Sequence, residues 1–233
     1  MKWNSSLLDH LQWSDTIINR EAKEKVAQQI AEKINNGDVI GAGSGSTVYM
    51  ALYAIAKRIK EEGLAIQMIP ASLEIGMTCE NLGIPVTSLL TDKPIWCFDG
   101  ADEVDPDNSL IKGRGGALFK EKLLICSGSK TYILVDESKL VKKLGTNFPV
   151  PVEIFPGSLT YVESALRKLN VTDIALRMAK GKDGPIITEN GNFLLDVRFE
   201  DIRPDYEQRI KSITGVIDSG LFIGYNVEIL VAK

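Results

Sequence analysis

The sequence is poor in the residues that most nucleophile and metal sites require. Its 233 residues contain one histidine, His10, and three widely spaced cysteines with no CxxC pair. A Ser-His-Asp triad, a Cys-His dyad or a His-rich metal centre would depend on that histidine, which lies outside every motif in the chain. We expect buried thiols in a reducing compartment, with no disulfide framework and no zinc knuckle. Any acid–base chemistry must therefore use carboxylates, lysines or tyrosines.

Long apolar runs and an excess of positive charge are also absent. No apolar run approaches the roughly 18 residues that span a bilayer. The formal net charge is −4 and the isoelectric point is about 5.2, which disfavours bulk binding to nucleic acid or to an anionic membrane. Residues 1–12 mix charged side chains with short apolar pairs, a pattern atypical of a signal peptide. We therefore expect a cytoplasmic protein without nucleic-acid or membrane partners.

Strand-like and helix-like segments alternate through the first 135 residues. Short apolar runs predict strands at 39–42, 65–69, 95–98 and 132–135. Apolar residues at helical spacing predict helices at 20–35, from 46 to a stop at Gly63, at 72–82 and at 116–127. This order predicts parallel βαβ units with right-handed crossovers.

The pattern changes after about Gly145. A proline-rich stretch leads into a helix through 162–169, a strand at 174–178, a hairpin signal at 189–192, a helix at 204–212 and a return at 215–217. The order β-α-β-β-α-β resembles a ferredoxin-like module, and the strand at 227–231 should rejoin the first sheet. We therefore predict an α/β fold: a Rossmann-like parallel-sheet domain, 1–145 and 218–233, with a smaller inserted α+β (ferredoxin-like) domain, 146–217.

The segment GAGSGST at 41–47 joins a predicted strand to a predicted helix. Glycines let the backbone approach an anion, and a helix start offers unpaired N–H groups, so a phosphate fits this turn; tight packing alone is the alternative. A Walker A loop needs a lysine before Ser46 or Thr47, and the dinucleotide fingerprint needs glycine in place of Ser46. We therefore expect no nucleotide cofactor.

Acidic and basic residues cluster further along the chain. The segment DGADEVD at 99–105 follows a strand, and KGRGGA at 112–117 opens a helix that carries Glu121. The acidic segment fits no EF-hand loop, and a solvated acidic turn is the alternative reading. A carboxylate base, a lysine and further acids near a phosphate loop suit enolisation, in which a base lifts the proton next to a carbonyl and cationic groups stabilise the enediolate.

Several motifs in the same order resemble the ribose-5-phosphate isomerase family, type A. They are GSGST at 43–47, DGADE at 99–103, KGRGGA at 112–117, KEK at 120–122, VDESK at 135–139 and FPVPVE at 148–153. The resemblance runs from about Lys23 to the C-terminus, and the first 20 residues receive no role. It implies interconversion of D-ribose 5-phosphate and D-ribulose 5-phosphate in the non-oxidative pentose phosphate pathway, through a cis-enediolate and without metal or cofactor. It also implies a homodimer or homotetramer.

The resemblance implies a role for each matching residue. Glu121 moves the proton between C2 and C1, Asp99 assists ring opening and hydroxyl proton transfer, and Lys112 stabilises charge on the sugar oxygens. Asp102 holds a hydroxyl group. The other expected substrate contacts are Lys23, Ser44, Gly45, Ser46, Thr47, Gly100, Ala101, Gly113, Arg114, Gly115 and Lys139. Segment 44–47 would bind the phosphate, with Lys23 and Lys139 as its cationic partners.

Two other functions fit part of the pattern. A sugar-phosphate-sensing regulatory domain could share the sheet and the phosphate loop, but the short N-terminal lead cannot hold a helix-turn-helix. An acyl-CoA transferase could use Glu121 as a nucleophile, but it would need a longer chain or a second subunit for CoA.

Overall fold

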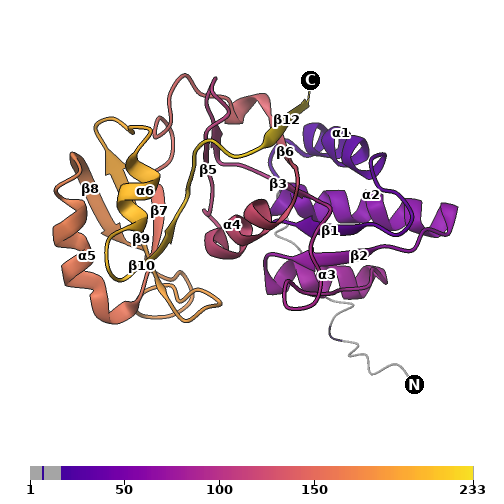
Figure 1. Ribbon diagram of the computed structural model, residues 1–233, viewed down its shortest axis with the longest axis horizontal. Coiled ribbons are helices and arrows are strands. Elements are labelled where there is room, and N and C mark those ends of the chain that lie inside the picture. The colour runs from indigo at the N-terminus through magenta and orange to yellow at the C-terminus, as the bar shows by residue number, and fades with distance from the viewer. Residues whose placement is uncertain (1–6, 8–16, 233) are drawn as a thin grey trace. The chain divides into compact units, whose positions relative to one another are not determined.

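The computed structural model describes Leu7 and residues 17–232, and its chain forms two compact units (Figure 1). The first unit comprises the chain up to Gly100, Leu123–Glu137 and the segment from Asn226 onward. The second unit comprises Ala101–Lys122 and Ser138–Tyr225. His10 lies outside the described residues.

The first unit is built on a parallel five-stranded sheet in the order β12-β6-β3-β1-β2. Its strands are β1 (Val39–Ala42), β2 (Gln67–Pro70), β3 (Trp96–Asp99), β6 (Thr131–Asp136) and β12 (Val227–Ala232). Its helices are α1 (Arg20–Ala31), α2 (Ser46–Glu62) and α3 (Leu73–Leu82). The apolar stripe Val48, Leu52 and Ile55 of α2 is fully buried in the core with Ile30 and Phe98. The predicted parallel sheet and the return of the last strand to it are confirmed.

The second unit contains an antiparallel four-stranded sheet in the order β10-β7-β9-β8. Its elements are β7 (Val150–Ile154), α5 (Leu159–Leu166), β8 (Val171–Leu176), β9 (Phe193–Phe199), α6 (Tyr206–Lys211) and β10 (Val216–Ser219). Alternate residues Val150, Val152 and Ile154 belong to one core with Val162 of α5 and Ile210 of α6. The β-α-β-β-α-β order and the strand arrangement confirm the ferredoxin-like module.

A small third sheet was not expected from the sequence. It pairs β4 (Glu103–Val104), β5 (Leu110–Ile111) and β11 (Leu221–Phe222), and strands of two residues carry no readable periodicity. These pairings join 101–122 to 218–225, and both segments belong to the second compact unit together with 138–145, while the predicted domain boundaries stay a prediction. The buried carboxylate of Glu103 accepts the N–H groups of Gly145 and Phe148, which fixes the last of these segments.

Some predicted boundaries also shift. Helix α4 (Leu118–Ser127) starts two residues later than expected, so Glu121 lies in its first turn. The proline-rich stretch contains strand β7, the first strand of the predicted β-α-β-β-α-β order; its range was not predicted because proline is disfavoured inside sheets. The remaining short helices are η2 (Glu137–Lys139) and η3 (Pro156–Ser158).

Two of the three cysteines match the expectation of buried thiols. Burial raises the pKa of Cys79 and of Cys97 to about 12. Cys126 is exposed, so the expectation was wrong for this residue: it lies on α4, where the side chain faces away from the core.

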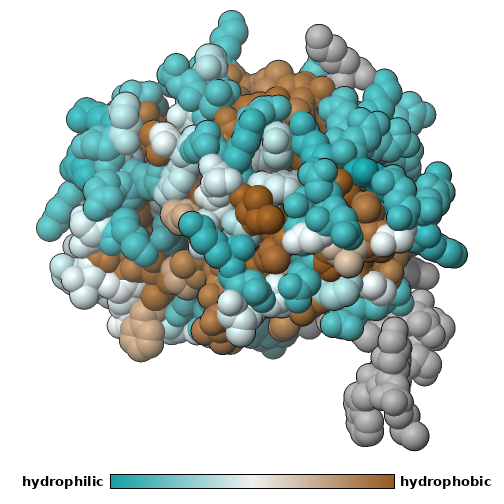
Figure 2. Space-filling view, turned by 45° about the vertical axis from the view of Figure 1, so that its right-hand side comes forward, coloured by the Kyte–Doolittle hydropathy of each residue, from teal (hydrophilic) through white to brown (hydrophobic). Residues whose placement is uncertain are grey.

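The surface of the described part is mixed. Figure 2 shows hydrophobic side chains in patches between hydrophilic ones. Among the described residues, no helix combines the length and the apolar character that crossing a membrane requires.

A buried ion cluster links helix α4 to α6 and β10 within the second unit. The Lys122 Nζ atom lies 2.8 Å from Asp218 Oδ1 and 2.7 Å from Glu207 Oε1, and it donates to the Leu221 carbonyl. Burial by itself would raise the pKa of Asp218, but the Lys122 charge and donors from Lys122, Lys211 and the Ser219 amide lower it overall.

This cluster predicts a pH-dependent stability. Because the Asp218 pKa is lowered on folding, its contribution is fully present above the unfolded pKa of about 3.9 and is lost as pH falls through the folded value. Asp218→Asn should reduce the free energy of unfolding by about 1–3 kcal/mol at pH 7. The difference from wild type should shrink towards pH 3, as measured by denaturant unfolding at several pH values. A constant difference would contradict this assignment, and Asp173→Asn, at an exposed carboxylate on β8, is the control.

Candidate functional site

The predicted phosphate loop connects β1 to α2 in the first unit. Gly45 has φ 107°, a conformation that favours glycine, and it directly precedes the first residue of α2. Because glycine has no side chain, it cannot cap the helix, and the first N–H groups of α2 keep the positive end of the helix dipole available to an anion. The open helix start at Gly45 suits an anion, whereas close packing accounts for Gly41, where a Cβ would lie 2.5 Å from Cys97 Sγ.

Asp99 sits beside this loop at the carboxyl end of β3. Its buried carboxylate accepts the N–H of Ser44 at 3.2 Å and of Gly100 at 2.7 Å. A Cβ on Gly43 would lie 1.8 Å from Asp99 Cγ, so position 43 admits only glycine while Asp99 keeps its place. The carboxylate and the loop therefore form one packed arrangement.

The hydroxyl groups of the loop have partners from elsewhere in the first unit. Lys23 Nζ donates to Ser46 Oγ at 2.9 Å, and Ser44 Oγ donates to Ser72 Oγ at 3.0 Å. A Cβ on Gly100 would lie 4.0 Å from Thr47 Cβ, so Thr47 borders the Asp99-Gly100 turn. The first unit thus brings these predicted residues together: Lys23, Ser44, Gly45, Ser46, Thr47, Asp99 and Gly100.

Lys112 and Glu121 form a buried ion pair in the second unit. Lys112 Nζ lies 3.5 Å from Glu121 Oε2, and the side chains are 2% and 6% exposed. The Lys112 N–H donates to the Gly220 carbonyl at 2.9 Å, which places the lysine directly after β5 and beside β11. Its ammonium also lies 5.7 Å from the centroid of the Phe222 ring. A titratable pair held this deeply matches the base and cation that enolisation requires.

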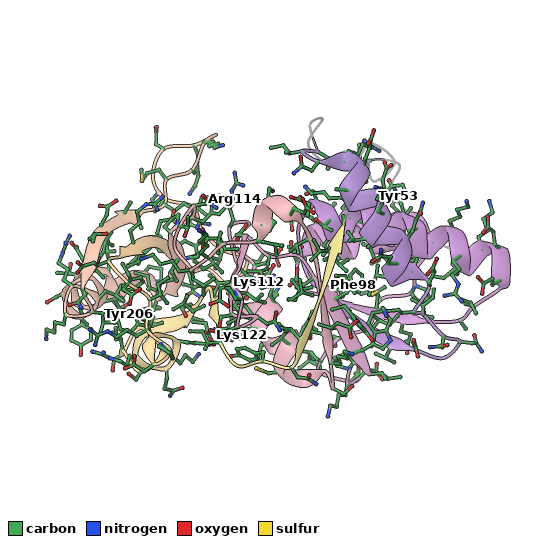
Figure 3. All side chains as sticks on the ribbon, turned by 90° about the horizontal axis from the view of Figure 1, so that it is seen from above. Tyr53, Phe98, Lys112, Arg114, Lys122 and Tyr206 are labelled. Carbon is green, nitrogen blue, oxygen red and sulfur yellow. The ribbon has the colours of Figure 1, made fainter. Side chains whose placement is uncertain are left out.

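The loop of residues 112–116, called the lysine loop below, is tied to Asp102. Asp102 Oδ2 accepts the Arg114 N–H at 3.1 Å, and the Asp102 N–H donates to the Ile111 carbonyl at 2.8 Å. Gly113 has φ 91°, and a Cβ there would lie 2.5 Å from Leu118 Cβ. Figure 3 shows Lys112 between Arg114 and Lys122 in its view of the second unit.

Two predicted cationic residues meet at one aromatic ring that the sequence analysis did not single out. The Arg114 guanidinium and the Lys139 ammonium each lie 5.3 Å from the centroid of Phe148. The Phe148 N–H is held at 2.8 Å by the buried Glu103 carboxylate. Phe148 lies within the FPVPVE motif, which is the signal that could have marked it. Glu103 lies within the DGADE motif, but no structural role could be assigned to it from the sequence, because its partners lie more than 40 residues away in sequence.

The predicted site residues therefore fall into two groups, one in each unit. Asp99 and Gly100 end the main segment of the first unit, and Ala101 begins the second unit. The second group comprises Ala101, Asp102, Lys112, Gly113, Arg114, Gly115, Glu121 and Lys139. Within the described part of the chain, no group of three or more His, Cys, Asp or Glu side chains is arranged to hold a metal ion.

Comparisons with known proteins agree with the motifs. The profile of ribose 5-phosphate isomerase A (phosphoriboisomerase A) matches residues 67–233. A ribose-5-phosphate isomerase A of Methanothermobacter thermautotrophicus is 40% identical over 204 residues, 87% of this chain and 89% of the relative. One of Archaeoglobus fulgidus is 39% identical over 219 residues, 92% of this chain and 96% of the relative.

Solved structures are similar over nearly the whole chain. The ribose 5-phosphate isomerase A of Methanocaldococcus jannaschii superposes with a TM-score of 0.89 at 38% identity, covering 92% of this chain and 96% of that one. A D-ribose-5-phosphate isomerase in complex with phospho-erythronic acid gives a TM-score of 0.87 at 35% identity, covering 91% and 94%. The resemblance read from the sequence motifs is confirmed: the chain belongs to the ribose 5-phosphate isomerase A family.

Proposed function

We propose that this chain is an aldose–ketose isomerase that interconverts D-ribose 5-phosphate and D-ribulose 5-phosphate. The observation that carries the proposal is the buried Lys112–Glu121 pair, 3.5 Å apart, in a member of this family. A related isomerase binds phospho-erythronic acid, a phosphorylated sugar acid, which supports a sugar phosphate as the ligand. Family membership removes the grounds for the sensor domain and for the CoA transferase.

The reaction needs one base and one stabilised oxygen. In the open-chain aldose, Glu121 takes the proton from C2, and the electron pair moves through C1–C2 onto the carbonyl oxygen O1. Lys112 supplies positive charge to the enediolate oxygens in a site of low exposure, where such charge acts strongly. Glu121 returns the proton to C1 while the hydroxyl proton passes from O2 to O1, which leaves the ketone at C2.

The remaining residues hold the substrate. Residues 44–47 bind the phosphate at the start of α2, and Lys23 adds its ammonium beside Ser46. Lys139 and Arg114, whose cationic groups lie against the Phe148 ring, attract the anionic substrate. Asp102 accepts a sugar hydroxyl, and Asp99 assists ring opening and the transfer of hydroxyl protons. Gly100, Ala101, Gly113 and Gly115 shape the backbone around the sugar.

The same proposal assigns the protein a pathway, a compartment and an oligomeric state. The reaction belongs to the non-oxidative pentose phosphate pathway, and we place the protein in the cytoplasm as a homodimer or homotetramer. The family resemblance supports these assignments, and sedimentation of the purified protein would test the oligomeric state.

The assignment of Glu121 predicts a large loss of turnover on substitution. Glu121→Gln keeps the side-chain volume but removes the base, so kcat should fall by about 10²–10⁴ in a protein that still folds. Because buried Lys112 loses the opposite charge beside it, the melting temperature should also fall. The coupled assay for ribulose 5-phosphate and a thermal melt measure both quantities. Glu80→Gln, at an exposed glutamate on α3, should retain wild-type kcat. Near-native turnover by a folded Glu121→Gln protein would exclude Glu121 as the base.

The assignment of the phosphate loop predicts an effect on binding. Thr47→Ala should raise KM for ribose 5-phosphate by about tenfold or more and change kcat much less, because the phosphate group does not react. Thr172→Ala, at an exposed position on β8, is the matched control. A collapse of kcat at unchanged KM would instead assign Thr47 to the chemistry.

The proton-transfer mechanism predicts catalysis that survives chelation. A hydride shift would need a divalent ion to polarise neighbouring oxygens, whereas Lys112 can supply that charge itself. The purified protein should convert ribose 5-phosphate to ribulose 5-phosphate after exhaustive treatment with EDTA. In D₂O, some turnovers should leave deuterium at C1 of the ketose. Activity that EDTA abolishes and added metal restores would overturn the metal-free mechanism, and failure of the untreated protein to form ketose would overturn the proposed function.

A further inference from the structure

Arg177 forms a two-point ion pair in the second unit. It follows β8, and its Nε donates to Asp196 Oδ2 of β9 at 2.9 Å while Nη2 donates to Asp196 Oδ1. The Arg177 N–H also donates to the Leu194 carbonyl at 2.9 Å, and its side chain is only 14% exposed. Two parallel bonds to one carboxylate fix the plane of the guanidinium. We call this pair the Arg177–Asp196 clamp.

The third guanidinium nitrogen binds the lysine loop. Arg177 Nη1 donates to the carbonyl of Arg114 at 2.8 Å and, more weakly, to that of Gly113 at 3.4 Å. The loop is closed by the Gly116 N–H, which donates to the Gly113 carbonyl at 3.0 Å. The clamp therefore joins the antiparallel sheet to the segment that immediately follows Lys112.

The direction of these carbonyls determines the direction of the amides that follow them. In a planar trans peptide, the C=O and the next N–H point in opposite directions. The Gly113 carbonyl faces Arg177, and the Arg114 N–H accordingly points the other way, to Asp102 Oδ2. The Arg114 carbonyl also faces Arg177, so the Gly115 N–H must point away from the clamp. No group in the described part of the chain accepts that N–H, and nothing lies within 4 Å of a Cβ built on Gly115.

We propose that Arg177 is a positioning residue for catalysis, which aims the Gly115 N–H at the substrate oxygen that gains negative charge. This inference rests on the proposed isomerase function. A fixed N–H donor in the loop that follows Lys112 would stabilise the enediolate without reorganising during the reaction, and one such donor accounts for about 10²–10³ in rate in other enzymes. Asp196 fixes the Arg177 guanidinium, and Asp102 accepts the N–H of Arg114 in the same loop.

Lysine cannot reproduce this arrangement. Its ammonium is a compact group without a planar fork, so it cannot bind two carboxylate oxygens and a carbonyl in fixed directions. Arg177→Lys would keep the charge but loosen the loop. This distinction separates positioning from a purely electrostatic effect of the arginine.

The test compares three variants of the clamp, Arg177→Met, Arg177→Lys and Asp196→Asn, with a control, Arg167→Met, at an exposed arginine on the same unit. The measurements are kcat, KM, melting temperature, and inhibition by phospho-erythronic acid and by inorganic phosphate. Phospho-erythronic acid carries a carboxylate where the enediolate forms, whereas inorganic phosphate occupies only a phosphate site.

Arg177→Met should lower kcat by about 10–100-fold and raise the inhibition constant of phospho-erythronic acid by a similar factor. Inhibition by inorganic phosphate should stay within about twofold of wild type. Arg177→Lys and Asp196→Asn should fall between wild type and Arg177→Met, and they test the clamp if the methionine variant does not fold. Arg167→Met should match wild type in every measurement.

Two results would overturn the proposal. Unchanged kcat and unchanged phospho-erythronic acid inhibition in a folded Arg177→Met protein would show that the clamp does not aim a catalytic donor. An equal rise in the inhibition constants of both anions, together with a lower melting temperature, would show that Arg177 only stabilises the fold. The proposed function has a separate readout: it fails if wild type forms no ketose, in which case the affinities of wild type and variants for the two anions, measured directly by calorimetry, still test the clamp.

Discussion

The burial of a lysine beside a glutamate is the constraint on which the proposed base and cation of the second unit depend. Removing both charges from water is costly, and their mutual attraction at 3.5 Å offsets that cost only if the surroundings hold both groups in place. The pairing of β5 with β11 fixes Lys112, and helix α4 fixes Glu121. The adjacent Lys122 cluster anchors the same turn of α4, so structural and proposed catalytic charges share one short helix segment.

The sequence predicted most of the architecture because its elements are long or strongly patterned. Helix α2 has a full apolar stripe, and the parallel strands are short apolar runs bounded by turns. The small β4-β5-β11 sheet could not be predicted, since two residues per strand carry no period and β11 lies more than 100 residues from β5. That sheet also joins residues 101–122 and 218–225 within the second compact unit.

The candidate site shows the same distinction between local and long-range information. Local motifs identified Glu121, Lys112 and the phosphate loop, because glycines and charged residues stand close together in sequence. Phe148 was not singled out although it lies in the FPVPVE motif, and Arg177 lies in none of the motifs; each contacts the lysine loop from a distant segment. Residues that support a site from a distance carry the pattern of ordinary strands and loops, and only the folded chain shows what they contact.

The contact between Gly43 and Asp99 has an evolutionary consequence. The φ angle at Gly43 is not in the left-handed region, so space rather than backbone conformation demands glycine there. Even one methyl group at position 43 would displace the Asp99 carboxylate. Natural selection should therefore act on Gly43 as strictly as on the aspartate itself, although glycine contributes no functional group. Substitutions at Gly43 should therefore be as rare among functional relatives as substitutions at Asp99.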